Sequence, residues 1–403
     1  MTIMAPFSFK GARVTQKMTG ASYTRYEDID KEALQKDIEA IKETIPAPNW
    51  EDFQHLLKLE RWGSGAVFAG IILIGVVSFF AMSGFAFWSL ALLAALLIGI
   101  GNTARWSNVT HPILHGAYDK VPNIPYEYTK AGYARGINRF WHWLDWIKPE
   151  AWEYEHNIMH HYHLGEDEDP DNVERNMKWL TESNIPMFIR YPFIFLVAAT
   201  WKFTYYAPNT LRILENKERR KRKEPELQVY EWNPLTPNGK ELWTQYMLPY
   251  SVAKFVVLPL LFALPFGWEG ATTALIILLL SELVANIHSF IVIVPNHSAE
   301  DIYQFSKPHK SQGEFYLRQI MGSVNYHTGT DLIDFGQGFL NYQIEHHLFP
   351  NMPHSFYQKM QPIVKDICKK HDLEYRQESV WKRAWMTVEL MVGKTKVLRV
   401  EGI

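Results

Sequence analysis

The sequence predicts an all-α integral membrane protein, with about four transmembrane helices arranged as two hairpins and a cytoplasmic helical cap. Three observations lead to this prediction. Long uncharged apolar stretches alternate with densely charged segments, and about 20 apolar residues are enough for one helical crossing of a bilayer. Each apolar stretch has a turn signal near its middle, and three histidine clusters are placed outside the stretches.

Composition argues against several other classes of protein. The net charge of −2 gives no reason to expect a nucleic-acid partner, and no zinc-finger, Walker or Rossmann spacing occurs. The single cysteine, Cys368, excludes an internal disulfide framework, and we interpret it as a small buried apolar residue. Because polar segments dilute the apolar ones, local windows of hydropathy decide the class rather than the average.

The N-terminal region, residues 1–60, is expected to be a polar lead-in, with an amphipathic charged helix over about residues 28–57. The first long apolar segment begins too far into the chain for a removable signal peptide. Four basic residues precede the first acidic one, Glu27. This pattern is compatible with an organellar transit signature, and equally with an ordinary bacterial N-terminus.

The first hairpin is expected at about residues 64–82 and 85–105. Between Arg61 and Arg105, 43 residues pass without a charged side chain, which is enough for two crossings of about 20 residues each. Ser83-Gly84 allows a tight turn near the middle. Both ends of the hairpin should therefore lie on the same side of the membrane, and the first histidine cluster follows directly.

The second hairpin is expected at about residues 246–266 and 270–294, with Phe266-Gly-Trp-Glu-Gly270 as its turn. Glu282 and Asn286 fall inside it at i,i+4 spacing, and polar groups in a bilayer are costly. We keep two interpretations of this pair. The first is support of a metal site or a proton path, and the second is hydrogen bonding between helices of the bundle.

The segment between the hairpins sets the orientation. Residues 186–206 are apolar but interrupted by Arg190, Pro192 and Lys202, which predicts an interfacial or re-entrant helix rather than a full crossing. The basic run Arg219-Arg-Lys-Arg-Lys223 follows, and the positive-inside rule assigns it to the cytoplasm. The histidine clusters lie on that same side. The domain that carries them is expected to span residues 61–355, followed by a cytoplasmic segment at 356–403.

The histidine clusters carry the chemistry. They are His111-x-x-x-His115, His156-x-x-x-His160-His161 and His346-His347. Residues four apart share one face of a helix, so His156 and His160 can bind one ion while His161 turns toward a neighbour. Pro112 indicates that His111 begins a new helix.

A lone histidine at a membrane surface is more often hydrogen-bonded than a ligand. Three clusters on one face, joined by His297 after the last apolar stretch, instead indicate joint binding of metal, and a pair of metals suits them better than one. Neutral imidazole suits iron, copper and zinc.

These motifs resemble those of the integral-membrane fatty acid desaturases, a histidine-box family that also contains hydroxylases and ketolases. Gln343-Ile-Glu-His-His-Leu-Phe-Pro350 resembles the third box. Glu155-His-Asn-Ile-Met-His-His-Tyr-His163, followed by Asp169-Pro-Asp171, resembles the second, and His111-Pro-Ile-Leu-His115 resembles the first. The resemblance covers about residues 64–353.

The resemblance implies a di-iron centre with two iron ions. Its implied ligands are His111, His115, His156, His160, His161, His297, Gln343, His346 and His347. Gln343 occupies a place where many members have a further histidine, as in front-end desaturases. His297 is assigned from its position after the last span, with His288 as a competitor, and His163 is expected to support the ligands.

The implied function is that of a membrane-bound fatty acyl desaturase that uses dioxygen. Its substrate would be an acyl-lipid, an acyl-CoA or an acyl carrier protein, and an apolar tunnel between the hairpins would hold the acyl chain. The sequence contains no His-Pro-Gly-Gly haem string, so a separate ferredoxin or cytochrome is expected to supply electrons. The basic run at residues 219–223 is a candidate docking site for such an acidic donor.

Two alternatives stay open at this point. One is a hydroxylase or ketolase on the same scaffold, because the first hydrogen abstraction is shared. The other is a non-enzymatic metal transporter or adaptor, which would need ligands near the middle of the bilayer. Substrate chain length and the position and geometry of the double bond cannot be deduced from the sequence.

Overall fold

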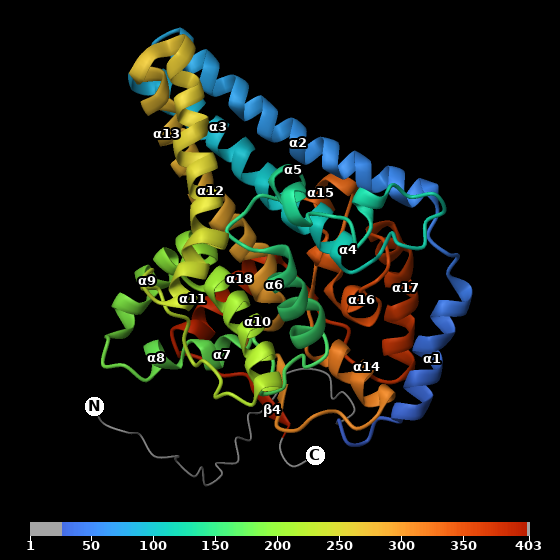
Figure 1. The fold of residues 1–403 in the computed structure, drawn as a ribbon. Helices are drawn as coiled ribbons and strands as arrows, with labels where there is room; N and C mark the ends of the chain where they lie inside the picture. Colours follow the sequence, from blue (N-terminus) through green and yellow to red (C-terminus); the bar gives the residue numbers. More distant parts are fainter. Residues whose placement is uncertain (1–25, 401–403) are drawn as a thin grey trace.

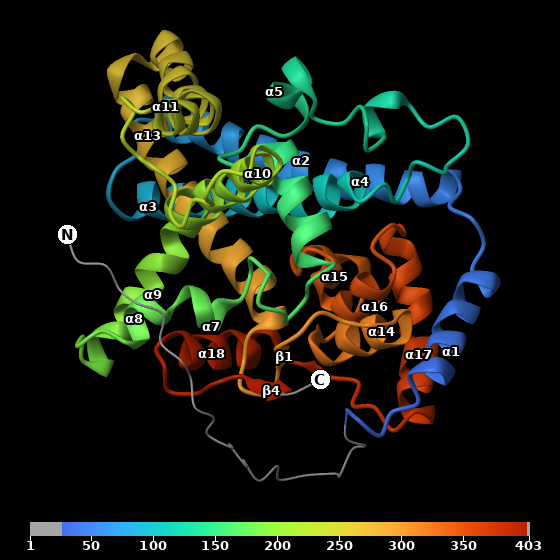
Figure 2. The ribbon, with the colours of Figure 1, turned by 60° about the horizontal axis from the view of Figure 1, so that its bottom comes forward.

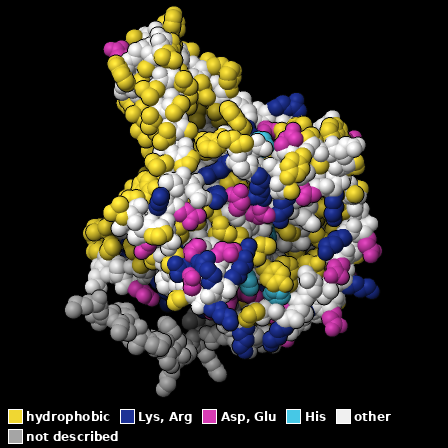
Figure 3. Space-filling view, in the orientation of Figure 1, with side chains coloured by type: hydrophobic (Ala, Val, Ile, Leu, Met, Phe, Trp, Pro, Cys, Tyr) yellow, Lys and Arg dark blue, Asp and Glu magenta, His cyan; other side chains and the backbone are white. Residues whose placement is uncertain are grey.

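The computed structural model describes residues 26–400, and most of them are helical. The transit-like basic segment lies outside the described residues. Apolar helices project from one side of a globular part (Figure 1). In the space-filling view apolar side chains cover the projecting helices, whereas charged side chains are spread over the globular part (Figure 3).

The first two apolar helices pack closely along their length. They are α2, Trp50–Phe79, and α3, Gly84–Ala104. A Cβ at Gly101 would lie 2.5 Å from the backbone oxygen of Gly63, and such close backbone approach is typical of helices that associate in membranes. The turn at Ser83-Gly84 is confirmed. However, α2 begins well before the predicted residue 64, because Asn49 and Asp52 form a capping box upstream of the charged first turns.

A third apolar run extends over Pro237–His297. It consists of α11 Pro237–Glu241, η6 Leu242–Met247, α12 Leu248–Val252, η7 Ala253–Val257, α13 Leu258–Ile293 and η8 Val294–His297. Helix α13 is broken at Gly267, where φ is 65° and ψ is −166°. The chain folds back there (Figure 1). The Nζ atom of Lys254 lies 2.7 Å from Oε2 of Glu282 across the two limbs. Within residues 26–400, three helices are long and apolar enough to cross a membrane: Trp50–Phe79, Gly84–Leu114 and Pro237–His297.

The globular part contains the longer helices α1 Lys31–Thr44, α9 Met187–Trp201, α10 Ala207–Arg222, α14 Gln312–Met321, α17 His354–Lys370 and α18 Val380–Met391. Shorter helices join them: η1 Arg105–Thr110, α4 His111–Leu114, η2 Tyr126–Tyr128, η3 Gly136–Asn138, α5 Arg139–His142, α6 Pro149–Glu153, η4 Tyr154–His160, α7 Val173–Asn176, α8 Lys178–Thr181, η5 Lys202–Tyr206, α15 Asp331–Gly336, η9 Leu340–Tyr342 and α16 Gln343–Leu348. Figure 2 shows α1 beside α17, with α14 and α16 next to them. Apolar residues of these helices share one core, with Leu34, Leu59, Tyr357 and Cys368 among its members.

Four short strands were not predicted. Strand β1, Tyr303–Phe305, pairs in parallel with β4, Leu398–Val400, and β2, Asn325–Tyr326, pairs with β3, Gln377–Glu378. Each has only two or three residues, so no alternating pattern can develop. Both ladders tie the C-terminal segment to the middle of the chain.

The polar residues inside α13 form a hydrogen-bonded network. The carboxylate of Glu282 accepts hydrogen bonds from Trp146 Nε1 at 2.7 Å and Tyr250 Oη at 2.7 Å. Asn286 Nδ2 donates to Glu282 Oε1 at 2.9 Å, and the backbone N–H of Lys202 donates to Asn286 Oδ1 at 3.1 Å. These contacts support the interpretation as hydrogen bonding inside the bundle, because Trp146, Tyr250 and Lys202 all belong to neighbouring helices or loops.

Candidate metal centre

Eight histidines from distant parts of the sequence come together at and beyond the ends of the apolar helices. They form two adjacent groups, and within each group the nearest ring nitrogens all lie within 4.8 Å of one another. The first group contains His111, His115, His156, His161 and His346. The second contains His160, His297 and His347. These are the eight histidines that the sequence singles out.

Two π-helical segments position the first and second clusters. η1 directly precedes His111, whose N–H bonds to the carbonyl of Trp106, five residues earlier. η4 contains His156 and His160, and the N–H of His161 donates to the carbonyl of His156 at 3.0 Å. Such i→i+5 bonds frequently occur at functional sites.

The π-helical turn changes how the second cluster is divided. The Nε2 atoms of His156 and His161 lie 3.2 Å apart in the first group, whereas His160 joins the second group. The sequence interpretation placed His156 with His160, and these two rings do lie close enough to share a site with Asp171, but it also turned His161 away. That division assumed α-helical spacing, and a turn closed by an i→i+5 bond instead brings His161 beside His156.

Side chains from other parts of the chain hold the rings of the second group. The Oε1 atom of Gln319 lies 2.8 Å from Nδ1 of His347, and Oδ1 of Asp169 lies 3.0 Å from Nδ1 of His160. A hydrogen bond on Nδ1 fixes the tautomer and leaves Nε2 as the atom with a free lone pair. Both rings therefore present Nε2 to the centre.

The same arrangement recurs at two further rings. The Nδ1 atom of His297 lies 2.8 Å from the carbonyl oxygen of Gly322, and Nδ1 of His346 lies 3.1 Å from Oη of Tyr357. None of the partners Gln319, Gly322 and Tyr357 was identified from the sequence. They lie 11 to 28 residues from the rings they orient, so only the tertiary fold reveals them.

The free nitrogens of the two groups fit metal ions. The Nε2 atom of His111 lies 3.1 Å from Nε2 of His156 and 3.0 Å from Nε2 of His346. Nε2 atoms of His115 and His347 are buried and have no hydrogen-bond partner among residues 26–400. Converging lone pairs without donors are costly to bury, and a cation that accepts several nitrogens removes this cost.

Electrostatics favours the neutral form of most of these rings. Burial, reinforced by the neighbouring imidazoles, lowers the pKa well below its ordinary value at His115, His156, His161, His346 and His347. His160 differs, because Asp169 outweighs the effect of burial and raises the pKa of His160. Neutral imidazole is the form that binds metal.

Gln343 lies beside the second group. Its amide Nε2 is 2.8 Å from Nε2 of His297, and its Oε1 has no partner among the described residues. Because the two amide atoms are interchangeable in placement, the side chain can equally turn its oxygen toward the centre. Gln343 is thus close enough to act as a weak ligand or to hold a water.

His163 and His288 do not reach either group. His163 Nδ1 pairs with Glu166 Oε2 at 2.9 Å, and Nε2 of His288 bonds to the carbonyl of Gly336 at 2.7 Å. The expectation that His163 supports the ligands is therefore wrong in the described structure, because the chain turns after His161 and carries His163 toward Glu166. His288 is likewise no competitor to His297.

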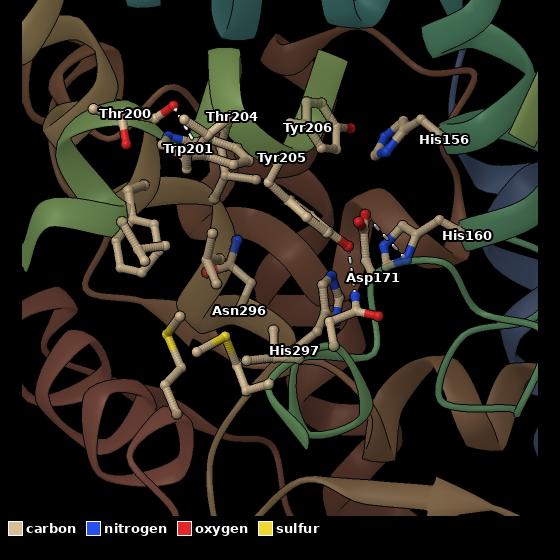
Figure 4. A pocket seen from close by; sticks show the side chains of 18 of the residues that line it. His156, His160, Asp171, Thr200, Trp201, Thr204, Tyr205, Tyr206, Asn296 and His297 are labelled. Atoms are coloured by element: carbon tan, nitrogen blue, oxygen red, sulfur yellow. Dashed lines mark hydrogen bonds and ion pairs between the residues drawn. The ribbon is translucent and has the colours of Figure 1, made fainter. Parts of the chain in front are cut away.

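An apolar cavity of about 460 Å³ leads to the histidines. His111, His156, His160 and His297 lie along its wall, and Figure 4 shows the last three at one end, with Thr200 toward the other. The remaining wall is mostly aromatic and aliphatic, including Trp106, Trp152, Trp201, Tyr205, Tyr206, Leu196, Phe290 and Met391. A pocket of this size and polarity suits a small apolar ligand or part of a chain.

The cavity is bordered by α9, η5 and the end of α13, and does not run between the two hairpins as expected. Small residues close that space. A Cβ at Gly99 of α3 would lie 2.5 Å from Cγ1 of Val284 in α13. The segment predicted to be merely interfacial, residues 186–206, thus provides much of the cavity wall.

Comparisons with known proteins agree with this arrangement. The sequence model described as "Fatty acid desaturase" matches residues 86–379. The chain is 24% identical over 388 residues to an NADPH-dependent stearoyl-CoA 9-desaturase of Mycobacterium tuberculosis, covering 92% of this chain and 82% of that protein. It is 25% identical over 302 residues to an sn-1 linoleoyl-lipid 6-desaturase of a Synechocystis species, covering 73% and 77%.

A Delta(5) fatty acid desaturase A of Dictyostelium discoideum is 24% identical over 305 residues, which cover 70% of this chain and 58% of that protein. The region matched by the family model contains all eight histidines of the two groups and Gln343. The chain therefore belongs to the fatty acid desaturase family and is an oxidoreductase, a fatty acyl desaturase.

Proposed function

We propose that this desaturase introduces a carbon–carbon double bond into an acyl chain with dioxygen, at a pair of iron ions held by the eight histidines and Gln343. The observation that carries the proposal is the convergence of two histidine groups at the inner end of an apolar cavity. When bound, iron supplies the redox chemistry with dioxygen that redox-inert zinc lacks.

The protein's own residues bind and orient the chain. Trp106 and Trp152 line the cavity next to His111 and His156, so their rings exclude water where the methylenes would lie. Asp169 and Gln319 keep His160 and His347 in one orientation. The position of the double bond would follow from which pair of methylenes this wall places beside the centre.

The reaction also fixes how many electrons a donor must supply. Two hydrogens and their electrons leave the acyl chain, a donor supplies two further electrons, and one dioxygen is reduced to two waters with two protons from solvent. We propose that the donor is a separate ferredoxin or cytochrome. The carrier of the acyl chain is a glycerolipid, coenzyme A or acyl carrier protein, and the names of the relatives include both a CoA and a lipid substrate.

We further propose four membrane crossings in two hairpins, with the metal centre on the cytoplasmic face. The break at Gly267 supports two crossings within Pro237–His297. The basic residues at the end of α10 support the orientation. An organellar membrane is compatible with the same topology.

Expression in a host with few native fatty acids tests the proposal. Mass spectrometry with localisation of double bonds should find a new unsaturated fatty acid, and metal analysis of the purified protein should find iron. His346→Ala should abolish the product, whereas His327→Ala, at an exposed position away from both groups, should retain it. A hydroxylated product without a new alkene would contradict desaturation.

A further inference from the structure

A second cavity, of about 720 Å³, reaches the histidines by a different route. His161 and His347 lie on its wall, whereas the first cavity contacts His111, His156, His160 and His297. The two cavities share no lining residue. The metal centre is therefore approached from two separate directions.

The second cavity differs from the first in chemistry. Polar side chains, those of Asn157, Gln312 and Asn351, stand in its wall beside aromatic rings. The aromatic residues are Tyr162, Phe315, Tyr316 and Phe349. Such a wall suits water and protein surfaces better than it suits an acyl chain.

His161, a proposed ligand that lines this cavity, has one ring nitrogen without a hydrogen-bond partner among residues 26–400. The Nε2 atom of His161 lies 3.2 Å from Nε2 of His156, so it faces the first group. Its Nδ1 atom is buried and has no hydrogen-bond partner among residues 26–400. His161 thus differs from His160, His297, His346 and His347, whose Nδ1 atoms all have protein partners.

Four lysines surround this approach. Lys42 and Lys120 line the cavity, and Lys307 and Lys310 are exposed on the loop before Gln312. The ring of His309, in the same loop, lies 5.2 Å from that of Tyr162. None of the four lysines has an ion-pair partner within residues 26–400, although Lys42 Nζ donates a hydrogen bond to Tyr316 Oη at 3.2 Å.

The basic run on α10 contrasts with these lysines. Arg219 and Arg222 pair with Glu215 and Glu224. Arg220 pairs with Glu226, and Lys221 with Glu218. Intrahelical and neighbouring carboxylates therefore neutralise most of the run that the sequence marked as a docking candidate, and it lines neither cavity.

We propose that the mouth of the second cavity is the docking site of an acidic electron-transfer protein, a small ferredoxin or cytochrome. The proposal rests on the proposed function, which requires two electrons per double bond from a donor. Each donor molecule delivers one electron when it docks, so one turnover requires two docking events. The unpaired lysines would attract the donor, and His161 and His347 would be the nearest groups of the metal centre.

Binding measurements on the purified iron-loaded enzyme test this proposal. The probes are a plant-type [2Fe–2S] ferredoxin and the soluble haem domain of a cytochrome b5, both acidic, and the readout is Kd at low salt and at 0.5 M salt. Lys120→Glu/Lys310→Glu should weaken binding of at least one probe by about tenfold or more at low salt. Arg220→Glu/Lys221→Glu on α10 is the matched control and should change Kd by less than about twofold.

Iron content and melting temperature are measured for each variant, so that a loss of fold is not mistaken for a loss of docking. Three outcomes would each overturn the proposal. The wild type and Lys120→Glu/Lys310→Glu could have equal Kd values, or Arg220→Glu/Lys221→Glu could raise Kd more than Lys120→Glu/Lys310→Glu does. The third outcome is that neither probe binds to the wild type. Because Kd is measured without turnover, its result is independent of whether a double bond is formed.

Discussion

At the scale of single residues, the candidate metal centre depends on side chains that hold the imidazoles in place. Gln319 belongs to α14, whereas His347 belongs to α16, and their contact is buried. In the same way, the hydroxyl of Tyr357 from α17 contacts Nδ1 of His346 and orients its ring. A ligand ring with one nitrogen hydrogen-bonded has a single orientation, and this is what allows several rings to converge on one point.

Gln319→Leu should therefore weaken metal binding without removing a ligand. Loss of such a partner typically costs about 10- to 100-fold in metal affinity, and the buried Nδ1–H of His347 would lose its acceptor, at about 1–3 kcal/mol. Iron retained after competition with a chelator measures the effect. Gln54→Leu, at an exposed and unbonded site on α2, is the control, and equal retention in both variants would contradict the assigned role.

At the scale of elements, departures from regular helix place the functional groups. The π-helical segments η1 and η4 precede or contain the first two histidine clusters. The break at Gly267 lets the third apolar run fold back on itself, so that Lys254 meets Glu282. With φ at 65° and ψ at −166°, Gly267 occupies a backbone region that is almost restricted to glycine.

Gly267→Ala should lower the stability of the folded protein in detergent. No atom lies within 4 Å of a Cβ added there, so the cost is backbone strain alone, about 1–3 kcal/mol. Gly75→Ala is the matched control, since a Cβ at this helical glycine also meets nothing within 4 Å. Apparent melting temperatures report the difference, and equal values would show that the turn tolerates a side chain.

Helix α1 is tied to the end of α17 by a pH-sensitive contact. Hydrogen bonds from Lys370 and His371 hold the pKa of Asp37 below its ordinary value, with Oδ2 lying 2.7 Å from Lys370 Nζ and 2.6 Å from His371 Nε2. A carboxyl whose pKa is lowered by folding stabilises the protein above the unfolded pKa of about 4 and loses this contribution as pH falls through the lower folded pKa.

Asp37→Asn should therefore lower the melting temperature at pH 7, and this effect should shrink as the pH falls below about 4. The effect is small, about 1 kcal/mol or less, because Lys370 is exposed and the pair is screened. Asp366→Asn, at an exposed position on α17, serves as the reference. If the difference in melting temperature between the wild type and Asp37→Asn stays constant from pH 7 to pH 3, the contact of Asp37 with Lys370 and His371 does not depend on the carboxylate charge.

At the scale of the whole molecule, periodicity and motif explain what could be predicted from the sequence. The uncharged stretch before Arg105 and the Ser83-Gly84 turn are local signals, and the structure confirms both. Helical spacing in the first two clusters, the adjacent pair His346-His347 and the place of His297 after the last apolar stretch identified the eight histidines, which the fold brings together.

What could not be predicted depends on contacts between distant segments. The division of His156, His160 and His161 between two groups follows from a π-helical turn that spacing alone does not reveal. The apolar cavity borders α9 instead of running between the hairpins, because glycine packing at Gly99 closes that space. Such packing depends on tertiary structure and produces no periodic pattern of residue types in the sequence.

The proposed four crossings can be decided by the side from which single cysteines react. With Cys368 replaced by alanine, Ser83→Cys and Glu269→Cys would place thiols at the two exposed turns, and Lys221→Cys would place one at the exposed end of α10. An impermeant maleimide added to intact spheroplasts should label the first two positions. It should label the third only after the membrane is opened, because two hairpins return the chain to the side of the histidines. Labelling of Glu269→Cys and Lys221→Cys from the same side would mean that the third apolar run does not cross twice.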